Sequence, residues 1–184
     1  MMLEIQNTQL IIIDIQGKLA QIVYEAENII NNTRILINAA KILNIPIIWV
    51  EQNPKGLGAT CPEIAELLSE NKAIPKMTFS AYGSEEFRNA VAKNNRKEVV
   101  VAGIETHICV YQTSLDLMQA GYELTLITDA VSSRTMENKL LGIEKLKDNG
   151  AKLSGTEMLI FELQKTCDSS TFKQILHLIK QHER

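Results

Sequence analysis

The sequence predicts an α/β protein in which a mostly parallel sheet of about six strands lies between two layers of helices. Short apolar runs alternate along the chain with helical patterns, as in successive βαβ units. The first of these runs, TQLIII, is continuously apolar, which is typical of a parallel strand covered on both faces. Right-handed crossovers between such strands then give a three-layer α/β/α arrangement.

Each predicted strand is a short apolar segment bounded by polar residues, glycine or proline. We expect strands at residues 8–13, 45–50, 73–77, 98–102, 124–127 and 151–153. Asp14 directly follows the first of these strands, and Asp129 lies two residues after the end of the fifth. Pro54, Gly56 and Gly58 predict a loop without regular structure after the second strand.

The predicted helices have an apolar face and recognisable ends. We expect them at residues 27–43, 62–69, 84–94, 106–120, 135–149, 156–164 and from 169 or 170 to 182. Thr106 is a suitable N-cap, and Gly121 and Gly150 are suitable terminators. The carboxyl ends of parallel strands form the binding crevice of such a sheet. Side chains directly after the strands are therefore the candidates for function.

The bulk composition favours one domain spanning residues 1–184, with a small-molecule substrate or another protein as its partner. A chain of 184 residues can bury about 70% of its unfolded surface. The charged fraction is 22% and the formal net charge is −3, so nothing favours a nucleic acid or an anionic membrane as partner. A G-x-G pattern occurs at Gly56 and Gly58 without the third glycine of a dinucleotide site.

The cysteines and the N-terminus favour a cytoplasmic protein. Cys61, Cys109 and Cys167 lie far apart in the sequence, which fits neither a disulfide framework nor a thiolate metal site. The N-terminal residues MMLEIQNTQ resemble no secretory leader, and no apolar run approaches the ~20 residues of a membrane span.

Cys109 is the candidate nucleophile. It lies in the predicted first turn of a helix that follows the strand ending near Gly103. Free backbone N–H groups and the helix dipole there favour a thiolate, and the N–H of Cys109 is a potential oxyanion donor. The alternative is a small buried apolar residue with no chemical role.

Asp14 and Lys76 are the other candidates for chemistry. A charge directly after an apolar strand can serve as a general acid or base, or it can cap a turn. Lys76 follows a short extended segment near a chain reversal, and on its own it is equally a solvated surface lysine. Spacing alone does not select between these interpretations.

Three segments together resemble the isochorismatase-like cysteine hydrolases, which include nicotinamidases. The segments are LIIIDIQ, IPKMTFSAY and GIETHICVYQTSLDLMQAGYELTLITDAVSSR, and the resemblance runs in order over residues 10–163. It implies a Rossmann-like isochorismatase fold and a catalytic triad of Asp14, Lys76 and Cys109. It also implies a cis peptide between Ile104 and Glu105, and an oxyanion hole formed by the backbone N–H groups of Glu105 and Cys109. The family commonly forms homo-oligomers, so we expect one here.

Departures from the family pattern narrow the expected chemistry. Nicotinamidases carry a D-x-H metal motif after the second strand, where this chain has Glu51, Gln52 and Asn53. We therefore expect no metal and no cofactor, and nicotinamide becomes a less expected substrate. Isochorismatases proper generally lack the cysteine and cleave a vinyl ether, so Cys109 argues against that reaction. The chain resembles the metal-free isochorismatase-domain branch.

The sequence thus predicts hydrolysis of a small amide or related C–N bond through a thioester intermediate. Gln16, Gln52 and Phe79 are the expected substrate-binding side chains, although loop hydrogen bonding or core packing would also explain them. Tyr82 and Tyr111 are possible further contributors. The alternative function is a non-catalytic binding or scaffold protein that keeps the hydrolase fold. The sequence names no substrate.

Overall fold

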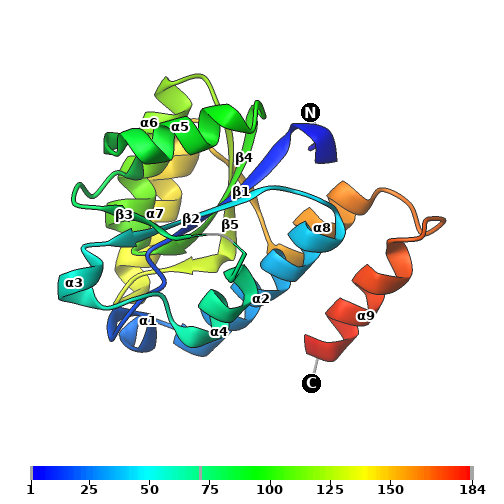
Figure 1. Ribbon diagram of the computed structural model, residues 1–184, viewed down its shortest axis with the longest axis horizontal. Coiled ribbons are helices and arrows are strands. Elements are labelled where there is room, and N and C mark those ends of the chain that lie inside the picture. The colour runs from blue at the N-terminus through cyan, green and yellow to red at the C-terminus, as the bar shows by residue number, and fades with distance from the viewer. Residues whose placement is uncertain (1, 71, 183–184) are drawn as a thin grey trace.

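The computed structural model describes residues 2–70 and 72–182, and its central feature is one parallel sheet (Figure 1). Over these residues the sheet has six strands in the order β3-β2-β1-β4-β5-β6. They are β1 Thr8–Ile13, β2 Ile47–Gln52, β3 Ile74–Lys76, β4 Glu98–Ile104, β5 Glu123–Ser132 and β6 Lys152–Ser154. Every neighbouring pair is parallel, so the predicted α/β class is confirmed.

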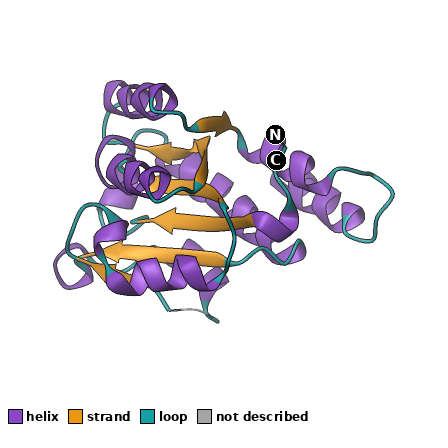
Figure 2. Cartoon of the chain, turned by 90° about the horizontal axis from the view of Figure 1, so that it is seen from above, coloured by secondary structure: helices purple, strands orange, loops and turns teal. Residues whose placement is uncertain are grey.

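Helices cover both faces of the sheet, as Figure 2 shows from above. The α-helices are α1 Leu19–Ile22, α2 Ala26–Ile42, α3 Pro54–Leu57, α4 Pro62–Ala65, α5 Glu85–Lys93, α6 Tyr111–Gln119, α7 Met136–Asp148, α8 Thr156–Gln164 and α9 Phe172–His182. Short 3₁₀ turns lie at Ile5–Asn7, Glu66–Leu68 and Ala81–Gly83, and a π-helical turn lies at Thr106–Val110.

The two faces of β1 divide the apolar core into two clusters. Leu10 and Ile12 pack with residues of α2, α8 and α9, whereas Ile11 and Ile13 pack with residues of α5, α6 and α7. Alternate residues of a strand point to opposite faces, so a continuously apolar strand supplies both clusters. The central position of β1 explains why its sequence shows no alternation.

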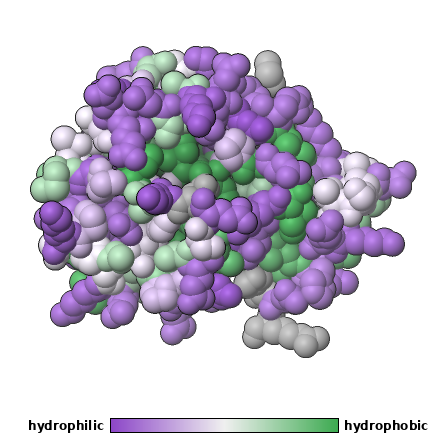
Figure 3. All heavy atoms as spheres, in the orientation of Figure 1, coloured by the Kyte–Doolittle hydropathy of each residue, from purple (hydrophilic) through white to green (hydrophobic). Residues whose placement is uncertain are grey.

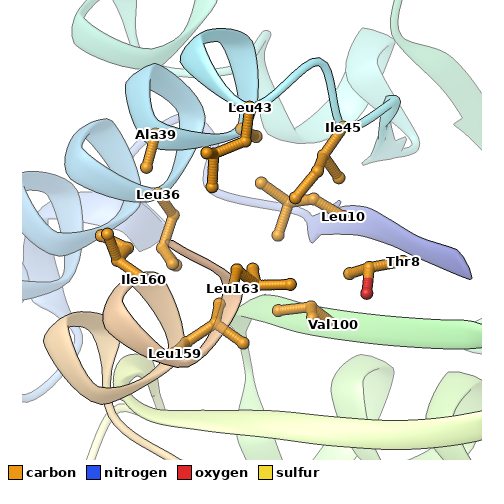
Figure 4. Close-up of a pocket in the computed structure, with 11 residues that line it drawn as sticks. Thr8, Leu10, Leu36, Ala39, Leu43, Ile45, Val100, Leu159, Ile160 and Leu163 are labelled. Carbon is orange, nitrogen blue, oxygen red and sulfur yellow. The ribbon is translucent and has the colours of Figure 1, made fainter. Parts of the chain in front are cut away.

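The first cluster contains a small internal void, shown in Figure 4. Leu36 of α2 and Leu43, directly after this helix, face Leu159 and Leu163 of α8 across it. Leu10 of β1 lies nearby. Its volume is about 20 Å³, close to the space of a single water molecule. Because the lining is almost entirely apolar, this void is a packing defect and not a binding site.

Three details differ from the sequence prediction. The predicted irregular loop contains helix α3, because Pro54 takes the first helical position, where a missing N–H costs nothing. Helix α1 was not predicted. Strand β5 continues through Ser132, past Asp129, whose carboxylate caps helix α8 by accepting from the Thr156 N–H and hydroxyl at 2.9 Å.

The surface in the orientation of Figure 1 is mostly hydrophilic. Figure 3 shows hydrophobic residues in the middle of this face and beside α8. No helix within the described residues is both long and apolar enough to cross a membrane.

Gly103 lies where β4 approaches β1, and it generates a prediction about stability. It has φ +135°, and a Cβ there would lie 2.1 Å from the Ile13 carbonyl oxygen. Gly103→Ala should lower the free energy of unfolding by at least about 2 kcal/mol, measured by guanidinium denaturation. Gly121→Ala is the matched control, since φ is +86° but no atom lies within 4 Å. It should cost about 1 kcal/mol. Equal losses in the two variants would contradict the steric argument.

Candidate active site

Three of the sequence-predicted residues meet at the carboxyl edge of the sheet. Asp14 directly follows β1, Lys76 ends β3, and Cys109 lies in the π-helical turn Thr106–Val110 after β4. All three are buried, with exposed fractions of 2%, 3% and 7%. Strands far apart in sequence therefore bring an acid, an amine and a thiol into one place.

Lys76 is held by a ring of oxygen acceptors. Its Nζ donates to Asp14 Oδ2 at 2.8 Å and to Gln52 Oε1 at 2.6 Å. It also donates to the carbonyl oxygens of Phe79 at 3.0 Å and Thr78 at 3.3 Å. A buried ammonium needs such partners to offset the loss of water. The segment after β3 thus supplies two of the acceptors for the lysine that ends this strand.

Asp14 has one oxygen engaged and one free. Oδ2 accepts from Lys76, whereas Oδ1 is buried and has no hydrogen-bond partner among the described residues. Burial raises the pKa of this carboxyl above its ordinary value of 3.8, and the charge of Lys76 acts in the opposite direction. A buried oxygen without a partner is available to accept a proton.

The turn that carries Cys109 differs from the predicted helix start. Glu105, and not Thr106, is the N-cap, and its carbonyl accepts from the N–H groups of Ile108 and Val110. Burial raises the pKa of Cys109 to about 12, the Asp14 carboxylate adds to this effect, and Lys76 opposes it. The expected stabilisation of a thiolate by the helix start is therefore outweighed. The raised pKa favours the protonated thiol.

Glu105 contributes backbone geometry to the site. The peptide bond between Ile104 and Glu105 is cis. The Glu105 carboxylate accepts from the backbone N–H and the Nε of Arg134, at 3.1 and 3.0 Å. Its own backbone N–H makes no hydrogen bond to any described residue. That N–H is available to a bound molecule.

Gly142 of α7 fixes the position of the nucleophile turn. A Cβ at this residue would lie 2.8 Å from the backbone carbon of Thr106 and 2.9 Å from the backbone nitrogen of His107. Backbone atoms this close leave no room for any side chain. Helix α7 therefore presses directly against the segment that carries Cys109.

A pocket of about 110 Å³ opens above this cluster. It is lined by Asp14, Gln16, Leu19, Gln52, Leu57, Phe79, Ile104, Glu105, Ile108 and Cys109. All the residues predicted as catalytic or binding line it except Lys76, which donates hydrogen bonds to two lining residues, Asp14 and Gln52. The apolar members Leu19, Leu57 and Ile108 were not singled out from sequence, because nothing distinguishes them from other leucines and isoleucines.

The three predicted substrate-binding residues are placed differently from one another. Gln16 is buried, and its amide donates to the carbonyls of Gln52 and Gly58 and accepts from the Gln52 N–H. The Gln52 side chain holds Lys76 and donates to the Met77 carbonyl at 2.9 Å. Phe79 is 55% exposed at the rim of the pocket, so it is not a core residue. Tyr82 and Tyr111 are not among the lining residues.

The strand-end position where nicotinamidases carry their metal motif has a structural role here. Glu51 accepts hydrogen bonds from the N–H and the hydroxyl of Thr60, at 2.6 and 2.7 Å. Within residues 2–70 and 72–182, no three His, Cys, Asp or Glu side chains are grouped so that they could hold a metal ion.

The sheet order defines an α/β protein, and the buried acid, lysine and thiol define a candidate active site at the carboxyl edge of its sheet. Comparisons with known proteins show the family. The family model described as "Isochorismatase domain" matches residues 8–158. A secreted isochorismatase effector, Isc1, from Phytophthora sojae is 36% identical over 96% of this chain and 86% of its own length.

Solved structures match over nearly the whole chain. A structure from Caenorhabditis elegans described as MAR1 ribonuclease has a TM-score of 0.91 and 36% identity, and covers 98% of this chain and 93% of its own. The YcaC gene product of Escherichia coli, described as an octameric hydrolase of unknown specificity, has a TM-score of 0.91 and 22% identity. Its match covers 99% of this chain and 93% of its own, and at that identity it shows the fold alone.

The chain belongs to the isochorismatase family. The resemblance that the sequence suggested is thereby confirmed, and membership of this family supports a hydrolase.

The coupling between Asp14 and Cys109 generates a prediction about thiol reactivity. The Asp14 carboxylate raises the pKa of Cys109, so Asp14→Asn should lower that pKa. At pH 8, Cys109 in the variant should react faster with iodoacetamide than in the unchanged protein, as measured by mass spectrometry. The half-buried Cys61 serves as the control, because an unchanged labelling rate there indicates an intact fold. A slower reaction at Cys109 would contradict the assigned interaction.

Proposed function

We propose that the protein is a single-domain cysteine hydrolase that cleaves a small amide or related C–N bond through a thioester intermediate. The observation that carries the proposal is the buried Asp14, which pairs with Lys76 through one oxygen and has no partner for the other among the described residues. It lines the same pocket as Cys109. Asp14 is the proton acceptor, Lys76 the charge that holds it, and Cys109 the nucleophile.

In the first half-reaction Asp14 takes the thiol proton as the sulfur attacks the amide carbonyl carbon. Because burial keeps the thiol protonated at rest, proton transfer accompanies the attack. The backbone N–H groups of Glu105 and Cys109 stabilise the tetrahedral oxyanion. Asp14 then gives the proton to the nitrogen, the C–N bond breaks, and ammonia or an amine leaves.

In the second half-reaction water replaces the sulfur. Asp14 accepts a proton from a water molecule, whose oxygen attacks the thioester carbon. The C–S bond breaks, the acid is released, and the proton returns to Cys109. One amide and one water are consumed, and one acid and one amine are formed. No oxidant or reductant is needed.

The second candidate function is a non-catalytic binding or scaffold protein with the same pocket. The high pKa of Cys109 is the observation that favours it, since a thiol with a pKa of about 12 reacts slowly without assistance. A ribonuclease, as the Caenorhabditis elegans relative is described, has less support. The chain has a net charge of −3, and no Lys or Arg lines the pocket among the described residues.

Assembly and location are part of the proposal. We propose a homo-oligomer, which the description of the YcaC structure as octameric supports. The exposed apolar residues Met136, Leu140 and Leu141 of α7 provide a surface for it. A cytoplasmic location remains a prediction, because the Phytophthora sojae relative is described as secreted.

The nucleophile assignment predicts a specific loss of activity. Cys109→Ala should reduce amide turnover by at least about 10³-fold, measured by ammonia release from a panel of small amides. Cys167→Ala is the matched control, because Cys167 is exposed and lies outside the pocket. It should leave turnover unchanged. Turnover that survives in Cys109→Ala, or RNA cleavage that it does not affect, would overturn the proposal.

The role of Asp14 predicts the acid side of the pH profile. Only the ionised carboxylate can accept the thiol proton, so activity should disappear as the pH falls through the pKa of Asp14. Burial raises that pKa above 3.8. The midpoint of the acid limb of kcat/KM should therefore lie above pH 3.8, with circular dichroism confirming that the protein stays folded. A midpoint at or below that value would exclude Asp14 as the base.

A further inference from the structure

The size of the pocket limits the acyl group of the substrate. Its volume of about 110 Å³ is well below the roughly 300 Å³ at which pockets for drug-sized ligands begin. Half of the lining residues are apolar: Leu19, Leu57, Phe79, Ile104 and Ile108. An apolar wall stabilises an apolar group and disfavours a polar group that finds no partner.

The amide side chains in the wall are already engaged. Both amide hydrogens of Gln16 go to backbone carbonyls, at 2.9 and 2.7 Å. The Gln52 oxygen accepts from Lys76, and its nitrogen donates to the Met77 carbonyl. Neither glutamine is free to bind a polar substituent of a substrate without giving up a bond that holds the site together.

The charges in the wall are also paired. Of the residues lining the pocket, Asp14 and Glu105 are ionisable acids, and each is paired with a cation. Lys76 holds Asp14, and Arg134 holds Glu105. A substrate carboxylate or phosphate would meet these two carboxylates and no unpaired cation among the described lining residues. A substrate ammonium would have to compete with Lys76 and Arg134.

We infer that the substrate is an uncharged small amide whose acyl group is a short aliphatic chain. The inference rests on the proposed function and adds the class of substrate. The lining residues include polar atoms that can act on the reacting carbonyl: Asp14 Oδ1, the thiol of Cys109 and the backbone N–H of Glu105. Everything beyond the carbonyl is received by apolar surface.

The first test compares amides of matched shape. Propanamide is paired with glycinamide, in which an ammonium group replaces the terminal methyl group. Butanamide is paired with succinamate, in which a carboxylate group replaces the terminal methyl group. We expect kcat/KM for ammonia release to be at least about tenfold higher for each neutral member. A charged amide hydrolysed as well as its neutral partner would overturn the inference while leaving the proposed function intact.

The second test measures the charge preference of the pocket by thiol labelling and does not require substrate turnover. Iodoacetamide and iodoacetate differ in charge and little in size, and both alkylate thiols. At each cysteine, the rate of labelling by iodoacetamide is divided by the rate of labelling by iodoacetate. This ratio should be at least about tenfold higher at Cys109 than at the exposed Cys167 of the same molecule. Equal ratios at the two cysteines, or a lower ratio at Cys109, would overturn the inference. A high ratio without any amide turnover would support the inference about the pocket and overturn the proposed function.

A variant with a positive charge in the pocket wall tests the same inference, with a second lysine variant outside the pocket as its control. Leu57 is 48% exposed at the pocket, so Leu57→Lys should fold and should raise the relative rate of iodoacetate at Cys109 severalfold. Leu153→Lys, on β6 and outside the pocket, should leave the rate ratio unchanged. Absence of a response to Leu57→Lys, or an equal response to Leu153→Lys, would contradict the inferred neutrality of the wall.

Discussion

The buried ion pair between Lys76 and Asp14 is the interaction on which the pocket depends. An ammonium without water must find acceptors in the protein, and removing one partner of such a pair typically costs about 3 to 5 kcal/mol. Here Gln52 and the carbonyls of Thr78 and Phe79 complete the set of acceptors. The path of the segment after β3 places two backbone carbonyls within hydrogen-bonding distance of the Lys76 ammonium. That path also places Phe79 at the rim of the pocket.

The same pair sets the state of the sulfur. A carboxylate beside a buried thiol disfavours a second negative charge, so Asp14 adds to the effect of burial in raising the pKa of Cys109. A protonated thiol is protected from alkylation and oxidation, which need the thiolate. Reactivity then depends on a carbonyl group arriving at the sulfur, and the position of the base relative to the thiol matters more than the acidity of the thiol.

Much of the fold was readable from the sequence, because continuous apolar runs such as TQLIII specify buried parallel strands. The edge of the sheet where Asp14, Lys76 and Cys109 meet followed from the same pattern, and the resemblance to a family selected Lys76 among many lysines. Sequence reasoning did not find the partners of Gln16 and Gln52, since long-range contacts to backbone carbonyls leave no local signal. It also predicted the wrong direction for the pKa of Cys109, because burial is a property of the assembled fold.

Helix α7 separates the nucleophile turn from the solvent. Its inner side touches the backbone of Thr106 at Gly142 without room for a methyl group, and its outer side exposes Met136 and Leu140. Close-packed protein has low compressibility, so a rigid helix in contact on one side transmits a force applied to the other. A side chain at residue 142 would therefore have to displace the turn that carries Cys109.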